Sequence, residues 1–141
     1  MAGKINNILV PIDGSQNAIR GLDKAIDIAK GSSATITALF VFQLPWKAGL
    51  KFTKSMEKEA QAKATRAIGI ARQKVERNGL TFNWKTAGGK PGDAILNVAK
   101  GSRADIIVIG ARGLGTEKEK FFGSRSNYVM HKAIKPVLVV K

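Results

Sequence analysis

The hydrophobic residues of this chain occur in two kinds of segment that alternate along its length. Short apolar runs rich in β-branched side chains, such as 106–110, are too short for a globular helix and are typical of buried strands of a parallel sheet. Longer segments carry apolar residues at helical spacing. The pattern predicts strands over 4–11, 35–42, 81–87, 106–110 and 137–140. Predicted helices start after Ser15 and end at Gly31, run from about Thr53 to Arg77, carry Ala94 to Ala99, and hold Val129 to Ile134.

Several residues mark where these elements should begin or end. Pro11 is expected to close the first strand, because proline cannot donate to a central ladder. Ser15 follows an Asp-Gly turn and is a natural N-cap for the first helix, and Gly31 is expected to end that helix. Residues 88–93 are expected to form a loop. Alternation of strands and helices over 141 residues predicts one α/β domain, a parallel sheet with helices on both faces.

The charge of the chain is its most unusual bulk property. It has 24 Lys plus Arg against 10 Asp plus Glu, a net charge of +14, and no cysteine. Such an excess favours anionic ligands or nucleic acid. The positive charge is spread out, with a net of +5 both in 51–77 and in 110–141, and no basic arm is present. We therefore expect no sequence-selective nucleic-acid binding, although a basic nucleic-acid-associated protein stays an alternative.

Residues 104–126 carry the strongest chemical signal. A predicted strand ends at Gly110, and Arg112, Gly113 and Gly115 follow it directly. A charged segment then leads to Gly123-Ser124-Arg125-Ser126, where a helical pattern opens. Glycines allow close approach of a ligand to the backbone, and unpaired N–H groups at a helix start bind anions. This stretch predicts a phosphate cradle.

The spacing Gly110-x2-Gly113-x9-Gly123-Ser124 resembles the nucleotide-binding signature of the universal stress protein family, in its ATP-binding branch. Residues 8–15 (ILVPIDGS) are similar to the opening strand and turn of that family. Residues 104–110 resemble its fourth strand and residues 135–140 its last strand. These segments are spread over essentially the whole chain in the expected order. The resemblance implies a doubly wound fold with strand order 3-2-1-4-5, whose topological switch point lies at the carboxyl ends of strands 1 and 4.

The resemblance also implies a set of residues that bind the nucleotide. Ser124 and Ser126 would donate hydroxyl and N–H groups to phosphates, and Arg112 would pair with phosphate oxygens. Asp13 would contact the nucleoside or a phosphate-bound metal, with an Asx turn to Ser15 as the alternative. Pro11 and Val41, the latter through its backbone, would flank the adenine. The full predicted set is Pro11, Asp13, Val41, Gly110, Arg112, Gly113, Gly115, Gly123, Ser124, Arg125 and Ser126, with Asp13 also as the candidate metal ligand.

The chain departs from the family pattern near the cradle. Arg125 stands where the family usually has a small apolar residue, and it could reach phosphate or point outward. Glu117 and Glu119 put negative charge near the proposed triphosphate, which repels it unless they turn away or bind Mg²⁺. These residues leave the affinity for nucleotide open.

Other chemistries find little support in the sequence. No Gly-Lys pair is followed by Ser or Thr, so the P-loop is absent, and no Gly-x-Gly-x-x-Gly follows the first strand. The chain has one histidine, His131, and no cysteine, so few residues are available to form a catalytic pair of nucleophile and general base. Any ATP hydrolysis should therefore be slow.

The sequence thus predicts an ATP-binding universal-stress-type protein that acts as a nucleotide-regulated binding module in the stress response. ATP with Mg²⁺ or Mn²⁺ is the expected ligand; binding of AMP, or of no nucleotide, is the alternative within the same family. The apolar last strand at a sheet edge predicts a homodimer. A protein partner is expected but not specified. The absence of a signal peptide and of a long apolar run predicts a cytoplasmic protein with no membrane contact.

Overall fold

The computed structural model describes residues 4–43, 53–112 and 123–141. Five parallel strands form one sheet in the order β3-β2-β1-β4-β5, which confirms the predicted fold. The elements follow one another as β1 (Asn7–Ile12), α1 (Gln16–Ser32), β2 (Thr35–Phe42), α2 (Lys54–Arg77), β3 (Phe82–Gly88), α3 (Pro91–Gly101), β4 (Ile106–Gly110), α4 (Ser124–Lys132) and β5 (Val137–Val140).

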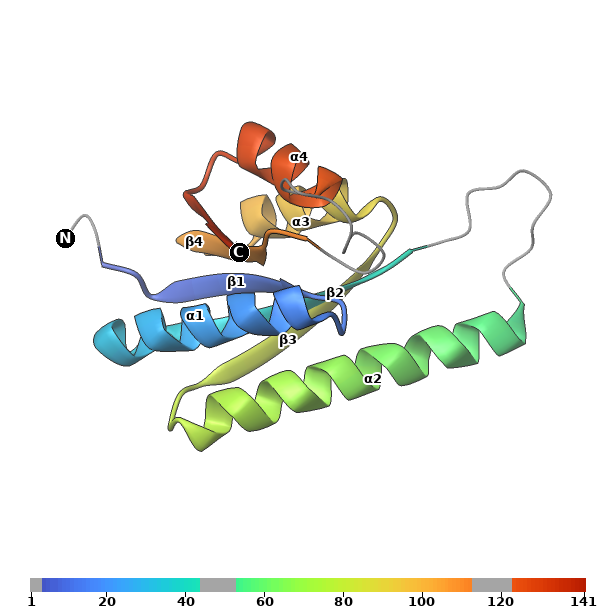
Figure 1. The fold of residues 1–141 in the computed structure, drawn as a ribbon, viewed down its shortest axis with the longest axis horizontal. Helices are drawn as coiled ribbons and strands as arrows, with labels where there is room; N and C mark the ends of the chain where they lie inside the picture. Colours follow the sequence, from blue (N-terminus) through green and yellow to red (C-terminus); the bar gives the residue numbers. More distant parts are fainter. Residues whose placement is uncertain (1–3, 44–52, 113–122) are drawn as a thin grey trace.

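The sheet lies between two layers of helices, with α1 and α2 on one face and α3 and α4 on the other (Figure 1). Alternating residues of the central strand supply both cores: Ile8 and Val10 pack with α1 and α2, and Leu9 packs with α3 and α4. All three are at most 1% exposed. Burial on both faces explains why these strands are continuous apolar runs rather than alternating ones.

The prediction that Pro11 ends the first strand is wrong. The strand continues to Ile12, and Pro11 pairs with Leu39 of β2. The carbonyl of Asn7 accepts a hydrogen bond from Asp105 on the β4 side, so the alternation along the strand places the backbone of Pro11 on that side too. Pairing of β1 with β4 covers only Ile8 and Leu9. The missing N–H of Pro11 therefore interrupts no hydrogen bond between β1 and β4.

Two helix boundaries, the end of α1 and the start of α3, also differ from the prediction. α1 continues past Gly31 to Ser32, and Ser33 itself adopts the left-handed conformation with φ 58°. α3 already begins at Pro91, because a proline at the first helical position needs no partner for its missing N–H. The predicted loop over 88–93 is correspondingly shorter.

The last helix ends earlier than its apolar pattern suggests. α4 stops at Lys132, and its C-cap Ala133 has extended backbone, three residues before a proline that could not continue the helix. Val129 is fully buried, but Met130 is 37% and Ile134 85% exposed. The expected apolar stripe on this helix is thus reduced largely to Val129.

Helix α1 approaches β4 unusually closely, and glycines on both elements allow it. A Cβ on Gly21 would lie 3.2 Å from the backbone nitrogen of Gly110. A Cβ on Gly110 would lie 2.5 Å from the carbonyl oxygen of Asn17, closer than real Cβ contacts allow. This packing places the N-terminal turn of α1 beside the end of β4.

The two edges of the sheet are β3 and β5, as the predicted order requires. All four residues of β5 are half-buried. Within residues 4–43, 53–112 and 123–141, we find no helix that combines the length and apolar character needed to cross a lipid bilayer.

Candidate functional site

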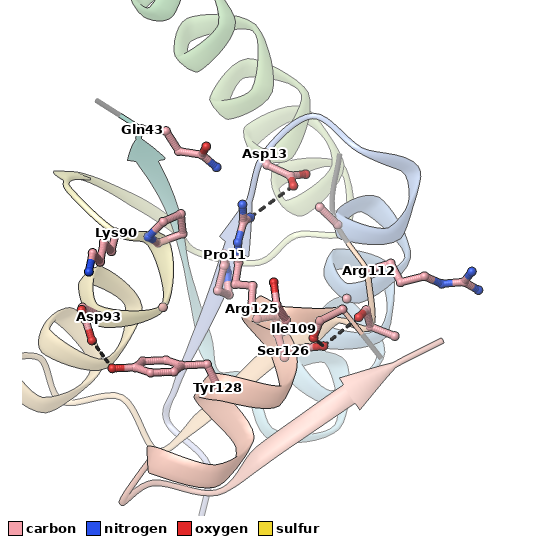
Figure 2. A pocket seen from close by; sticks show the side chains of 17 residues that line it. Pro11, Asp13, Gln43, Lys90, Asp93, Ile109, Arg112, Arg125, Ser126 and Tyr128 are labelled. Carbon is pink, nitrogen blue, oxygen red and sulfur yellow. Dashed lines mark hydrogen bonds and ion pairs between the residues drawn. The ribbon is translucent and has the colours of Figure 1, made fainter. Parts of the chain in front are cut away.

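A cavity of about 490 Å³ lies at the carboxyl ends of β1 and β4. This is the topological switch point of the sheet, where ligands of doubly wound folds bind, and the volume falls in the range of ligand pockets. The described residues that line it come from the ends of β1, β2 and β4 with the residues that follow them, and from the starts of α1, α3 and α4: Pro11, Asp13, Ala18, Gln43, Lys90, Pro91, Gly92, Asp93, Ile109, Gly110, Ala111, Arg112, Gly123, Ser124, Arg125, Ser126 and Tyr128 (Figure 2).

The start of α4 presents backbone N–H groups near this cavity. Gly123 is the N-cap, with no side-chain cap, and its N–H donates to the carbonyl of Ala111 at 2.7 Å. The N–H of Asn127 makes the first intrahelical bond, to the carbonyl of Gly123. The N–H groups of residues 124–126 precede it and have no intrahelical acceptor, as at any helix start. They give this end of the cavity a partial positive charge.

The two serines at this helix start have different roles. Ser126 is 1% exposed, and its hydroxyl lies 2.7 Å from the carbonyl oxygen of Ala111 and 3.0 Å from that of Gly123. It fastens α4 to the end of β4, so its hydroxyl is already engaged within the protein. Ser124 is an exposed residue that lines the cavity, so it is the serine of this pair that is accessible to a ligand.

Asp13 bridges two parts of the site. Its Oδ1 accepts a hydrogen bond from the N–H of Ser15 at 2.8 Å, which is the Asx turn considered as an alternative from the sequence. Its Oδ2 lies 3.3 Å from Nη1 of Arg125 (Figure 2). The hydroxyl of Ser15 in turn accepts from Ala18 N–H at 3.1 Å and caps α1, as predicted. Asp13 is therefore held rigidly at the end of β1.

The remaining predicted residues are placed as follows. Gly110 lines the cavity, but its missing Cβ is explained by the contact with Asn17 of α1. Arg112 lines the cavity while its guanidinium extends away from the group around Asp13 (Figure 2). Val41 is absent from the lining and packs against the core under α3 and α4. Gly113 and Gly115 lie outside the described residues.

The sequence interpretation missed the wall formed by the start of α3. Lys90 is the N-cap of α3, and Gly92 lies against the ring of Tyr128, since a Cβ there would be 2.5 Å from Cδ1. The Tyr128 hydroxyl donates to Asp93, and this hydrogen bond raises the pKa of Tyr128 above 10.0 (Figure 2). The predicted strand order could have revealed this wall, because all connections from a strand to the next helix leave a parallel sheet at the same edge.

The lining is mixed in charge. Among the described residues it holds three basic side chains, Lys90, Arg112 and Arg125, and two acidic ones, Asp13 and Asp93. Both carboxylates already have partners within the protein. No group of three His, Cys, Asp or Glu that could hold a metal occurs in the part of the chain that the structure describes. The described part of the lining is thus better suited to an anion than to a bare cation.

Together, the fold and this cavity define a doubly wound α/β protein with a ligand crevice at its switch point. The family model of the universal stress protein family matches residues 4–141. The chain belongs to the universal stress protein family.

Individual relatives agree with this assignment. Universal stress protein YxiE of Bacillus subtilis is 30% identical, over 96% of this chain and 99% of the relative. A universal stress protein of Thermus aquaticus is 34% identical, over 95% and 97%. Among solved structures, UspA from Lactobacillus plantarum superimposes with a TM-score of 0.87 at 27% identity, over 99% of both chains.

Two structures with the same fold contain nucleotides. A universal stress protein in complex with cAMP matches with a TM-score of 0.77 at 23% identity, over 99% of both chains. A family member from Arabidopsis thaliana with AMP bound matches with a TM-score of 0.73 at 21% identity, over 96% of this chain and 91% of that one. At this identity the likeness concerns the fold.

Proposed function

We propose that this protein binds an adenine nucleotide in the switch-point cavity and acts as a nucleotide-regulated binding module. The observation that carries the proposal is the convergence of the N-terminus of α4 with Arg125 on a cavity of about 490 Å³ at the ends of β1 and β4. A helix start with a basic side chain beside it binds phosphate well. The cAMP and AMP held by proteins of the same fold support adenine as the base.

The phosphates would lie against the first turn of α4. The backbone N–H groups there and the exposed hydroxyl of Ser124 are hydrogen-bond donors, and Arg125 adds a full positive charge. Arg112 and Lys90 line the same cavity and add to the positive potential. Gly113, Gly115 and the two glutamates at 117 and 119 lie outside the described residues.

The nucleoside would lie toward the strand ends. Pro11 and Ile109 give this part of the cavity an apolar floor, and Gln43 and Asp13 bring polar groups to its rim. An apolar surface with a few polar groups is typical of pockets that bind a planar base. Val41 does not line the cavity, so we expect Gln43, the lining residue that follows β2, to contact the base on that side.

The family resemblance implies a divalent ion with the triphosphate, and the described residues fit a phosphate-held ion only. Among the described residues, Asp13 is the candidate ligand from the sequence, and its two oxygens contact Ser15 and Arg125. Mg²⁺ commonly binds through one or two carboxylates plus substrate phosphates. The ion would shield phosphate charge, while the chain itself would hold the nucleotide.

We expect regulation rather than turnover from this site. A phosphoryl-transfer enzyme needs a residue that orients the nucleophile and groups that stabilise the charge on the transferred phosphate. The described lining holds two carboxylates, each engaged with a neighbouring side chain. Slow ATP hydrolysis at most is expected, with nucleotide occupancy as the signal that a partner protein reads.

Calorimetric titration with ATP, AMP and adenosine, each with and without Mg²⁺, tests this proposal. We expect saturable binding at micromolar concentrations and a melting temperature that rises with nucleotide concentration. Flat titrations up to millimolar concentrations would overturn the proposal. Binding to mixed-sequence DNA that weakens steeply with salt would instead favour the nucleic-acid-associated alternative.

A further inference from the structure

Arg125 reaches from α4 to the opposite wall of the cavity. It belongs to the first turn of α4, and its Nη1 lies 3.3 Å from Oδ2 of Asp13, a residue 112 positions earlier in the chain (Figure 2). Both side chains line the cavity. They are partly shielded, with 28% of the Arg125 side chain and 15% of the Asp13 side chain exposed. The guanidinium therefore lies in the part of the cavity that a bound ligand would also contact.

The two partners differ in how firmly they are held. Asp13 is fixed by the hydrogen bond from Ser15 N–H at 2.8 Å, in the turn that also caps α1. Arg125 has a long side chain, and its contact with Oδ2 of Asp13 uses one nitrogen of its guanidinium. A guanidinium has five N–H donors in a fork that matches a phosphate with two parallel bonds. If the pair opens, Arg125 is the partner that moves.

A phosphate group competes well with Asp13 for this arginine. The contact with Asp13 is a single one at 3.3 Å, whereas a bidentate charge-assisted pair with a phosphate is shorter and stronger. A phosphate in the cavity would also gain the N–H groups of α4's first turn, beside which Arg125 is anchored. Asp13, by contrast, is held in the α1 turn through its Oδ1.

We propose that Arg125 determines the specificity of the site for phosphorylated ligands, by exchanging Asp13 for the phosphate when a nucleotide enters the cavity. The inference rests on the proposed function and names the residue through which that site distinguishes a nucleotide from a nucleoside. The ion pair with Asp13 is thus the state of Arg125 before a phosphate binds. Its opening changes the contact between α4 and the end of β1.

The test is a double-mutant cycle between Asp13 and Arg125, read as the ratio of AMP affinity to adenosine affinity in each protein. Both ligands are measured on the same variant. The ratio therefore cancels any effect of the substitution on folding or on binding of the adenosine part of the ligand. Arg125→Met should lower the ratio about tenfold, and Arg125→Lys should lower it less, since it keeps the charge but loses the fork. Arg103→Met is the matched control, an exposed arginine before β4 at the opposite end of the sheet, and should leave the ratio unchanged.

Asp13→Asn separates exchange from simple repulsion. Exchange predicts that this variant raises the ratio about fivefold in the wild-type background, because Arg125 no longer has to leave a carboxylate. In the Arg125→Met background the same change should alter the ratio less than twofold. Repulsion between Asp13 and phosphate would raise the ratio equally in both backgrounds, and that result would overturn the proposal.

Two further results are decisive. If Arg125→Met weakens AMP and adenosine by the same factor, Arg125 only braces the cavity and the specificity proposal is wrong while nucleotide binding stands. If the wild-type protein binds neither ligand, the proposed function falls and the exchange falls with it. The two failures are therefore distinguished by adenosine and AMP binding to the unmodified chain.

Discussion

Gly110 and Asn17 are in direct backbone contact, with the Cα of the last β4 residue set against the first turn of α1. A Cβ on Gly110 would lie 2.5 Å from the Asn17 carbonyl oxygen. Gly110→Ala should therefore destabilise the fold by about 2 kcal/mol or more, because backbone on both sides must shift. Chemical denaturation measures this loss. The same shift would move the cavity wall, so nucleotide affinity should also fall.

Gly69→Ala is the matched control for this prediction. Gly69 lies exposed within α2, and a Cβ there would meet nothing within 4 Å. Alanine favours the helix over glycine by roughly 1 kcal/mol, so this variant should be more stable than the parent. Equal effects of the two substitutions would contradict the close contact of α1 with β4.

The two serines at the start of α4 should separate stability from binding. Ser126→Ala removes a buried hydroxyl between the carbonyls of Ala111 and Gly123 and should cost about 1–2 kcal/mol in unfolding free energy. Ser124→Ala removes an exposed hydroxyl and should change stability little, but it should weaken AMP binding relative to adenosine. Denaturation and calorimetry on both variants check this division. Stability loss in Ser124→Ala alone would contradict it.

Tyr128 should ionise at higher pH than a free tyrosine. The hydroxyl donates to the Asp93 carboxylate, and this bond raises the pKa of Tyr128 above 10.0. Because the chain contains one tyrosine, the absorbance of tyrosinate in a pH titration reports this group alone. Asp93→Asn removes the negative charge and should bring the pKa back toward 10.0.

The sign of the stability effect follows from the same hydrogen bond. The protonated phenol is favoured in the folded state, so its contribution is present below the unfolded pKa of about 10 and is lost as the pH rises through the folded pKa. Tyr128→Phe should lack this part of the pH dependence. A titration midpoint at or below 10 in the folded parent would contradict the hydrogen bond.

The open edge of β5 should pair two copies of the chain. Pro136 and Val140 direct their carbonyls toward β4, accepting from Ile107 and Ala111, so Val137 and Val139 direct their backbone groups outward. Val139→Pro removes an outward N–H without breaking an internal bond and should convert a dimer at micromolar concentration into a monomer. Sedimentation measures both proteins. A monomeric parent would contradict the prediction.

Much of the architecture followed from local patterns. Apolar runs such as 106–110 and stripes such as that of α1 predicted element type and order, because burial on two faces or on one leaves a distinct period in the sequence. The ends of elements were less well predicted. Pro11 lies within β1 because β4 pairs with only the first part of that strand, and a strand's neighbours are a property of the sheet.

The sequence by itself determined that a helix opens at Gly123-Ser124 after the strand that ends at Gly110, since helix starts and strand runs depend on adjacent residues; that Gly123 rather than Ser124 is the N-cap came from the structure. Only the tertiary structure decided what these residues touch. It set Gly110 against α1, buried the Ser126 hydroxyl, brought Arg125 to Asp13 and placed the start of α3 opposite α4. Such contacts join residues up to 112 positions apart, and their distances depend on how helices pack on the sheet, which no local pattern encodes.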